Sequence, residues 1–93
     1  MQVEMHPIVV DNDVPKVPAL ELRIITQFIK SKLSDKPLTF SKELRVEFPQ
    51  YRISSITDYR ILFKIIRDTI TILAIVPAGA CKQYIKHVPL DYI

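Results

Sequence analysis

Apolar residues recur with two different periods along the chain, and the change of period separates a helical part from a β-rich part. Between residues 18 and 33 they fall three or four positions apart, at Leu22, Ile25, Ile29 and Leu33. That spacing aligns them on one face of an α-helix. Pro18 suits the first turn and Pro37 closes the helical region, so the pattern predicts a helix over residues 18–33.

Two shorter segments flank this helix. Before it, residues 3–10 are rich in valine and isoleucine and are interrupted by His6-Pro7, which predicts an edge strand because proline has no N–H to donate. After it, residues 38–48 predict a short second helix capped near Ser41. The sequence leaves open whether residues 1–17 pack on the domain or form an arm.

Three β-prone runs follow Pro49, at residues 51–56, 59–65 and 69–76. Their connectors are only two residues long and lack glycine, so we predict an antiparallel meander whose turns are not the preferred glycine types. The third run is apolar on both faces at its end, which favours the centre of the sheet. Gly79 follows it, and residues 81–88 are expected to be a final strand or a tail.

These elements predict a single α+β domain over residues 1–93. An antiparallel sheet of about four strands would carry one or two N-terminal helices packed on one face. A chain of 93 residues is too short for two independent cores, and its 48% hydrophobic content is enough for one.

Few residues suit metal, cofactor or covalent chemistry. The single glycine excludes glycine-rich phosphate loops. His6, His87 and Cys81 have no recognised metal-binding spacing, so we expect no metal and no cofactor. Cys81 could act as a nucleophile with His87 as its base, but a lone cysteine is more often a small buried hydrophobe.

The sequence also indicates a compartment. One cysteine cannot form an internal disulfide, which favours a reducing environment. The N-terminus does not resemble a signal peptide, and no apolar segment approaches the roughly 20 residues that a membrane span needs. We therefore expect a cytoplasmic protein with no membrane association.

Charge is unevenly distributed along the chain. Residues 1–21 carry a net charge of −3 and residues 22–93 carry +6. On the predicted strands Arg52, Arg60 and Lys64 alternate with apolar neighbours, and we expect the two arginines to recur on one side of the sheet. Such a face suits RNA cleavage by its own 2′-hydroxyl, because cations stabilise the charged phosphorus centre. A merely solvated face, or one covered by an acidic protein, fits the same charges.

At residues 51–76 the chain reads YRISSITDYRILFKIIRDTITILAIV, which resembles the strand core of the RelE/ParE toxin superfamily. In that superfamily a Tyr-Arg or Tyr-Lys strand leads into an Asp-Tyr-Arg type turn, a Leu/Ile-rich strand, a charged two-residue turn and an apolar strand. Upstream, KSKLSDKPLTFSKELR is similar to the end of the family's helix and the loop beyond it. The resemblance covers about residues 18–76.

The resemblance implies roles for particular residues. Arg60 matches the arginine that would bind and polarise the scissile phosphate. Arg52 matches a basic position on the preceding strand and would be a second catalytic residue, which anchors the RNA backbone or helps to activate the 2′-hydroxyl. Ser54 stands where many members have a further basic residue that contacts substrate, and Lys64 is a further substrate-binding candidate. After Val76 members have a Gly-His-Arg or Gly-Lys-Arg turn, whereas this chain reads VPAGACKQYIKHV. The residues left to serve there are Lys82 and Lys86 as phosphate ligands and Tyr84 or His87 as general acid.

The function that the resemblance implies is that of a toxin in a type II toxin–antitoxin system. It would be a metal-independent endoribonuclease that cleaves mRNA on the ribosome, and it would form a hetero-oligomer with its cognate antitoxin. Two alternatives remain open. A ParE-like protein would inhibit DNA gyrase by binding it, and a decayed homologue would keep the fold without the activity.

Overall fold

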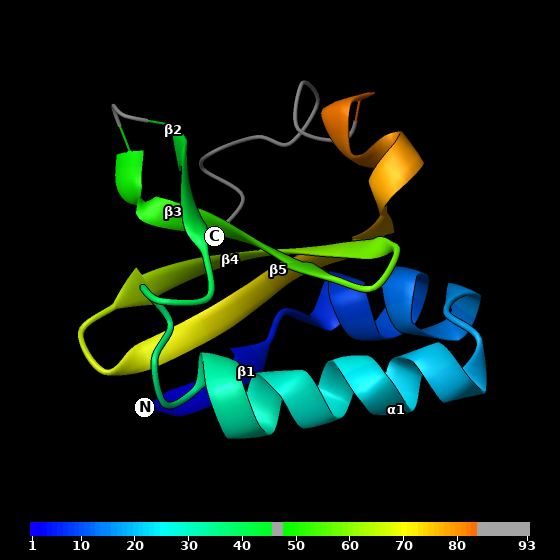
Figure 1. Ribbon diagram of the computed structural model, residues 1–93, viewed down its shortest axis with the longest axis horizontal. Helices are drawn as coiled ribbons and strands as arrows, with labels where there is room; N and C mark the ends of the chain where they lie inside the picture. The colour runs from blue at the N-terminus through cyan, green and yellow to red at the C-terminus, as the bar shows by residue number, and fades with distance from the viewer. Residues whose placement is uncertain (46–47, 84–93) are drawn as a thin grey trace.

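The computed structural model describes residues 1–45 and 48–83, which form one five-stranded mixed sheet with helical segments on its faces (Figure 1). The strand order is β1-β5-β4-β3-β2. The elements in chain order are β1 (Gln2–Met5), η1 (Val9–Asp13), η2 (Val14–Lys16), α1 (Ala19–Phe28), η3 (Ile29–Leu33), β2 (Lys42–Arg45), β3 (Phe48–Ile56), β4 (Tyr59–Ile66), β5 (Thr69–Pro77) and η4 (Ala78–Ala80). The predicted α+β class is confirmed, with one strand more than the four expected. The expectation of a purely antiparallel sheet is wrong, because β1 pairs parallel with β5.

The predicted helix over residues 18–33 is confirmed. It consists of α1 and a final π-helical turn, η3, in which the Ser34 N–H donates to the Ile29 carbonyl at 2.9 Å. Pro18 lies one position before the first helical residue, in an extended conformation. The residues that face the sheet follow the predicted spacing and are buried, at Ile25, Phe28, Ile29 and Leu33.

The N-terminal segment packs on the domain. β1 is an edge strand, as predicted, and it runs parallel to β5. The prediction that the strand extends to Val10 is wrong, because the chain turns helical after His6 and Val9 is fully buried. Pro7 explains the break: it cannot donate to a sheet ladder, whereas its fixed φ suits the first turn of a helix.

The predicted second helix over residues 38–48 is wrong. Residues 42–45 form β2, which pairs antiparallel with β3 through Lys42↔Ile53 and Glu43↔Arg52. The Ser41 hydroxyl donates to the Pro37 carbonyl and does not cap a helix. This short segment has only a weak preference for helix, so its pairing with β3 outweighs that local propensity and makes it a strand.

The predicted meander is confirmed over β3, β4 and β5, all antiparallel. The first residue of each connecting turn lies in the left-handed region, with φ of 51° at Thr57 and 56° at Arg67. The expectation that residues 69–76 form the central strand is wrong, because β4 lies in the middle and β5 lies between β1 and β4. Both strands are interior, so an apolar run on both faces does not distinguish them.

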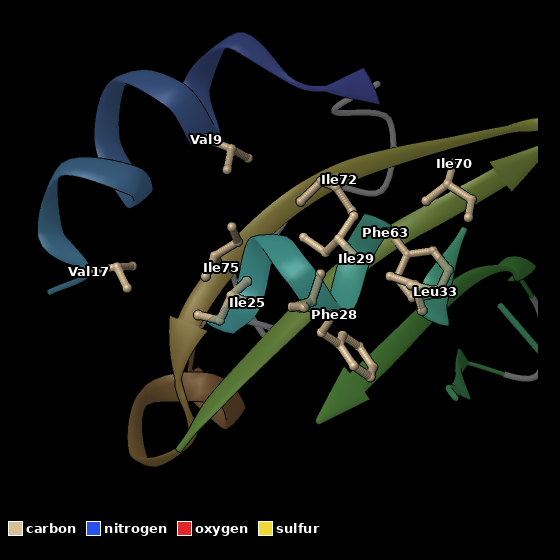
Figure 2. Close-up of a cluster of buried hydrophobic side chains, with 11 residues drawn as sticks. Val9, Val17, Ile25, Phe28, Ile29, Leu33, Phe63, Ile70, Ile72 and Ile75 are labelled. Atoms are coloured by element: carbon tan, nitrogen blue, oxygen red, sulfur yellow. The ribbon is translucent and has the colours of Figure 1, made fainter. Parts of the chain in front are cut away.

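Each face of the sheet carries its own apolar cluster. The helix face packs Ile61, Phe63, Ile70, Ile72 and Ile75 against α1, η3 and the N-terminal turns, as Figure 2 shows for the labelled residues. The opposite side, here called the far face, carries Leu62, Ala74 and Val76, against which Cys81 and the half-buried Leu44 and Ile53 pack. Within the described residues the far-face cluster is smaller than the helix-face cluster.

The last described residues follow Pro77. η4 begins there and residues 81–83 continue as a helical turn, so the described part of the predicted strand or tail at 81–88 is helical. Within residues 1–45 and 48–83 no helix is both long and apolar enough to cross a membrane.

Candidate functional site

The position of Arg60 follows from the turn between β3 and β4. The two-residue connector Thr57-Asp58 pairs Ile56 with Tyr59, which sets Ser55 directly opposite Arg60. Residues paired across antiparallel strands share a face, and Leu62 lies two positions beyond Arg60 on the far face. The turn therefore fixes Arg60 and Ser55 on the far face of the sheet.

Arg60 lies beside an open groove of about 330 Å³. The far-face side chains Ile53, Ser55 and Arg60 form its floor, and the segment that leads into β2 forms its wall, at Thr39, Phe40, Ser41 and Lys42. One guanidinium nitrogen of Arg60 donates to the Tyr59 carbonyl at 2.9 Å. A guanidinium has five N–H donors, so this bond leaves the side chain able to grip a phosphate oxygen.

Arg52 lies on the helix face, opposite to Arg60. Its partner across β4 is Phe63, which is fully buried in the helix-face cluster. The expectation that the two arginines recur on one side is therefore wrong. The physical reason is the register that the two-residue turn sets, which pairs Arg52 with Phe63 and Ser55 with Arg60. Paired residues share a face and successive residues of a strand alternate between faces, so Arg52 lies with the odd-numbered residues of β4 and Arg60 with the even-numbered ones.

Arg52 and Ser54 both hold the segment before β2. The Arg52 Nε donates to the Ser41 hydroxyl at 2.6 Å, and a terminal N–H of Arg52 donates to the Ser41 carbonyl at 3.1 Å. The hydroxyl of Ser54, which is 1% exposed, donates to the Phe40 carbonyl. These bonds fix one wall of the Arg60 groove. Substrate contact by Arg52 or Ser54 stays a prediction.

The remaining candidates are spread along the far face and beyond it. Lys64 shares the face of Arg60 and pairs with Tyr51 and Thr71, four positions along β4, which is roughly 13 Å away. Lys82 is exposed in the helical turn that follows η4. Tyr84, Lys86 and His87 lie outside the described residues. The structure thus brings together Arg60, Lys42 and Ser55, and sets Lys64 further along the same face.

Cys81 is buried against Leu62, Ala74 and Val76. Burial raises the pKa of its thiol, and the charge of the nearby Arg60 opposes that rise without cancelling it. A thiol held in its neutral form is a poor nucleophile. Within the described residues no three His, Cys, Asp or Glu side chains are grouped closely enough to hold a metal ion.

Sequence reasoning missed Ser55 and the wall residues Thr39, Ser41 and Lys42. Ser55 could have been found, because a two-residue turn fixes the register of the strands that it joins. The wall residues gave no such signal, since they were assigned to a helix. Their approach to β3 depends on the pairing of β2 with β3, such as Lys42 with Ile53, which a helical period does not report.

No family model and no curated protein sequence matches the chain. Among solved structures it is similar to a chain of the toxin–antitoxin complex RelBE2 from Mycobacterium tuberculosis. That match has a TM-score of 0.74 at 27% identity and covers 82% of this chain and 95% of the other.

Two further solved structures share the fold at lower identity. A chain of the archaeal RelE–RelB complex from Pyrococcus horikoshii matches with a TM-score of 0.60 at 20% identity, over 84% of this chain and 94% of that one. A conserved hypothetical protein from Helicobacter pylori matches with a TM-score of 0.61 at 12% identity, over 85% and 96%. Each match spans nearly the whole of the other chain.

Proposed function

Because this chain belongs to the RelE-like toxin superfamily, we propose that it is the toxin of a type II toxin–antitoxin pair and cleaves mRNA as a metal-independent endoribonuclease. The observation that carries the proposal is the position of Arg60, whose side chain lines an open groove on the far face. A cation beside an open groove suits an extended, anionic substrate. The substrate class we propose is mRNA on the ribosome, in the cytoplasm.

In the proposed reaction the RNA supplies its own nucleophile. The 2′-hydroxyl gives up its proton to a water molecule as it attacks the adjacent phosphorus, the bond to the 5′-oxygen of the next nucleotide breaks, and that oxygen takes up a proton. The products are a 2′,3′-cyclic phosphate and a free 5′-hydroxyl. Arg60 binds the non-bridging oxygens and stabilises their extra negative charge as the phosphorus becomes five-coordinate. No external nucleophile has to be generated, so the step needs no metal-bound water.

Proton transfer is assigned to side chains near the C-terminus. We propose Tyr84 or His87 as the general acid that protonates the leaving 5′-oxygen, with Lys82 and Lys86 as phosphate ligands. A lysine offers one point charge where an arginine offers a planar fork, so these lysines would hold the phosphate less tightly. Lys64 and Lys42 carry positive charge along the far face and would contact the RNA backbone on either side of the cleaved bond.

The proposed protein partner is a cognate antitoxin. By their names, the two solved complexes that the chain resembles contain RelB together with RelE. We propose that this chain forms a hetero-oligomer of the same kind, in which the antitoxin prevents mRNA from reaching Arg60. Residues 22–93 carry a net charge of +6, which favours a partner with acidic segments.

The test is induced expression of the full chain in a bacterium that lacks its antitoxin, with growth and mRNA 5′-ends followed together. We expect growth arrest and new 5′-ends inside coding regions. Arg60→Ala should abolish both. Arg67→Ala, which removes an exposed arginine from the β4–β5 turn, is the matched control and should stay toxic. New 5′-ends that persist in Arg60→Ala would overturn the assignment of Arg60.

A second candidate is ParE-like inhibition of DNA gyrase by binding. The observation that favours it is that two positions expected to contact substrate do not lie beside Arg60: Arg52 is bonded to Ser41 on the helix face, and Ser54, where the family resemblance implies a basic residue, is buried on that same face. DNA supercoiling measured in the same cultures separates the two functions. Arrest with altered supercoiling and unchanged mRNA ends would favour gyrase, and normal growth would favour a decayed toxin.

A further inference from the structure

A second groove, of about 600 Å³, lies on the helix side of the molecule between α1, η3 and the end of β3. Its floor is apolar and consists of Ile24, Phe28, Phe40 and Ile56. Phe28 and Phe40 meet edge to face with their ring centroids 6.0 Å apart and an interplanar angle of 82°. This edge-to-face geometry is a favoured one for aromatic pairs.

The apolar surface continues along α1 beyond the groove. Ile24 is 39% exposed and Leu20, one turn earlier, is 65% exposed. Leu20, Ile24 and Phe28 lie four positions apart and therefore form one strip, roughly 12 Å long at the rise of an α-helix. An exposed strip of large apolar side chains is typical of a surface that binds a partner. Its length suits two turns of a facing helix better than a compact small molecule.

The rim of the groove is positively charged. Arg23 stands at the α1 end and Lys32 at the η3 end, and the other polar lining residues are the neutral Gln27 and Ser31. Among the described residues that line the groove there is no carboxylate. The Lys32 ammonium lies 5.5 Å from the centroid of the Phe40 ring, close enough for a cation–π contact. An occupant of this groove is therefore favoured if it is apolar at its centre and acidic at its ends.

We propose that this groove docks an amphipathic helix of a partner protein, whose apolar residues at i and i+4 fill the floor while acidic residues near its ends pair with Arg23 and Lys32. This is the helix-in-groove mode of recognition. The apolar contact supplies most of the affinity, and the two cations set the orientation and reject basic helices. The floor residue Ile56 belongs to the helix-face cluster, whereas Arg60 lies on the far face, so the docking site stands whether or not the chain cleaves RNA.

The test is selection of displayed helical peptides, with randomised surface positions, on the purified full-length chain. We expect the selected peptides to share apolar residues at i and i+4 with acidic residues on both sides. Synthetic copies of the selected peptides, titrated by calorimetry, should bind the Ile24→Asp variant at least about tenfold more weakly than the wild-type chain. The double variant Arg23→Glu with Lys32→Glu should show a loss of similar size. Lys64→Glu makes the same kind of charge reversal on the far face and should leave the affinity unchanged.

Three results would overturn the proposal. The first is a selected peptide set without acidic residues, or one whose binding survives Ile24→Asp. The second is competition for the groove by a single-stranded RNA oligonucleotide, which would make the cations a nucleic-acid contact. The third is a dimer in analytical ultracentrifugation that Ile24→Asp dissociates, because a second copy of this chain would then be the occupant. Ile24 is partly exposed, so Ile24→Asp should keep the wild-type melting profile, which circular dichroism checks.

Discussion

Arg52 of β3 is joined to Ser41 by two hydrogen bonds, from its Nε to the serine hydroxyl at 2.6 Å and from a terminal N–H to the serine carbonyl at 3.1 Å. The Ser41 hydroxyl donates onward to the Pro37 carbonyl. This chain of bonds ties the segment before β2 to the sheet, and that segment is the wall of the groove beside Arg60. The role of Arg52 that follows from these contacts is to hold the groove in shape.

Arg52→Ala should therefore lower the free energy of unfolding, by about 1.5 to 3 kcal/mol, because it removes two hydrogen bonds to a charged group. Arg52→Lys should recover only part of the loss, since an ammonium cannot reproduce the fixed fork. Arg60→Ala is the matched control and should cost less than about 1 kcal/mol, because Arg60 bonds only its neighbour's carbonyl among the described contacts. Urea denaturation measures all three, and an Arg52→Ala variant as stable as the wild type would contradict this role.

The three strands of the meander were predictable from the sequence, and their faces were only partly so. Alternation correctly grouped Arg52 with Ser54 and Arg60 with Lys64, but alternation within one strand does not say which group faces the helices. The two-residue turn contained the missing information, because it pairs Ser55 with Arg60 and hence Arg52 with Phe63. Arg60 does line the groove on the far face, whereas Arg52, expected on the same side, lies on the opposite face.

The segment at residues 38–48 shows what local patterns cannot supply. Its residues have no strong preference for helix or strand, and its structure is set by pairing with β3 and by the bonds to Arg52 and Ser54. The bonds from Arg52 and Ser54 and the pair Lys42–Ile53 join residues about 11 to 14 positions apart, which a local period does not report. The long helix at residues 18–33 was predictable because its own spacing already specified the buried face.

Asp13 gives the fold a pH dependence. Its Oδ2 accepts the N–H of Ile75 in β5 at 2.9 Å, just beyond the point where β1 stops pairing with that strand. Burial raises the pKa of the Asp13 carboxyl above its ordinary value, against the opposing effects of this hydrogen bond and of Lys16. Because the folded state holds the proton more tightly than the unfolded state, the contribution of Asp13 is most favourable below the unfolded pKa of 3.8 and is lost as the pH rises through the folded value.

Asp13→Asn should therefore be at least as stable as the wild type at neutral pH and should lack this part of the pH dependence, since a neutral amide oxygen still accepts the Ile75 N–H. Asp13→Ala leaves that buried N–H without its partner and should cost about 1 to 3 kcal/mol. Asp11→Asn alters an exposed carboxylate in the same turn and is the control. Denaturant midpoints across the acid range measure these effects. If Asp13→Asn were as unstable as Asp13→Ala at neutral pH, the charge itself would be required.

Thr57 should be a site where the fold can be stabilised. It is a β-branched residue with φ of 51°, a conformation that costs most side chains about 1 to 2 kcal/mol and that asparagine adopts more readily. Thr57→Asn should raise the melting temperature by about 2 to 6 °C, which corresponds to roughly 0.5 to 1 kcal/mol in a domain of this size. Asp58→Asn changes the next turn residue and should have little effect. A fall in melting temperature on Thr57→Asn would mean that the Thr57 hydroxyl bond to the Ile56 carbonyl outweighs the strain.

Cys81 should be slow to react in the native protein, which tests whether it can serve as a nucleophile. Its side chain is 6% exposed, and burial raises the pKa of the thiol so that little thiolate forms near neutral pH. Alkylation by iodoacetamide should be at least about tenfold slower than in the urea-unfolded chain. Arg60→Gln removes the nearby charge at similar size and should slow it further, because the arginine partly offsets the effect of burial on the thiol pKa. Native Cys81 that reacts as fast as the unfolded thiol would contradict its burial and would reopen a covalent role beside Arg60.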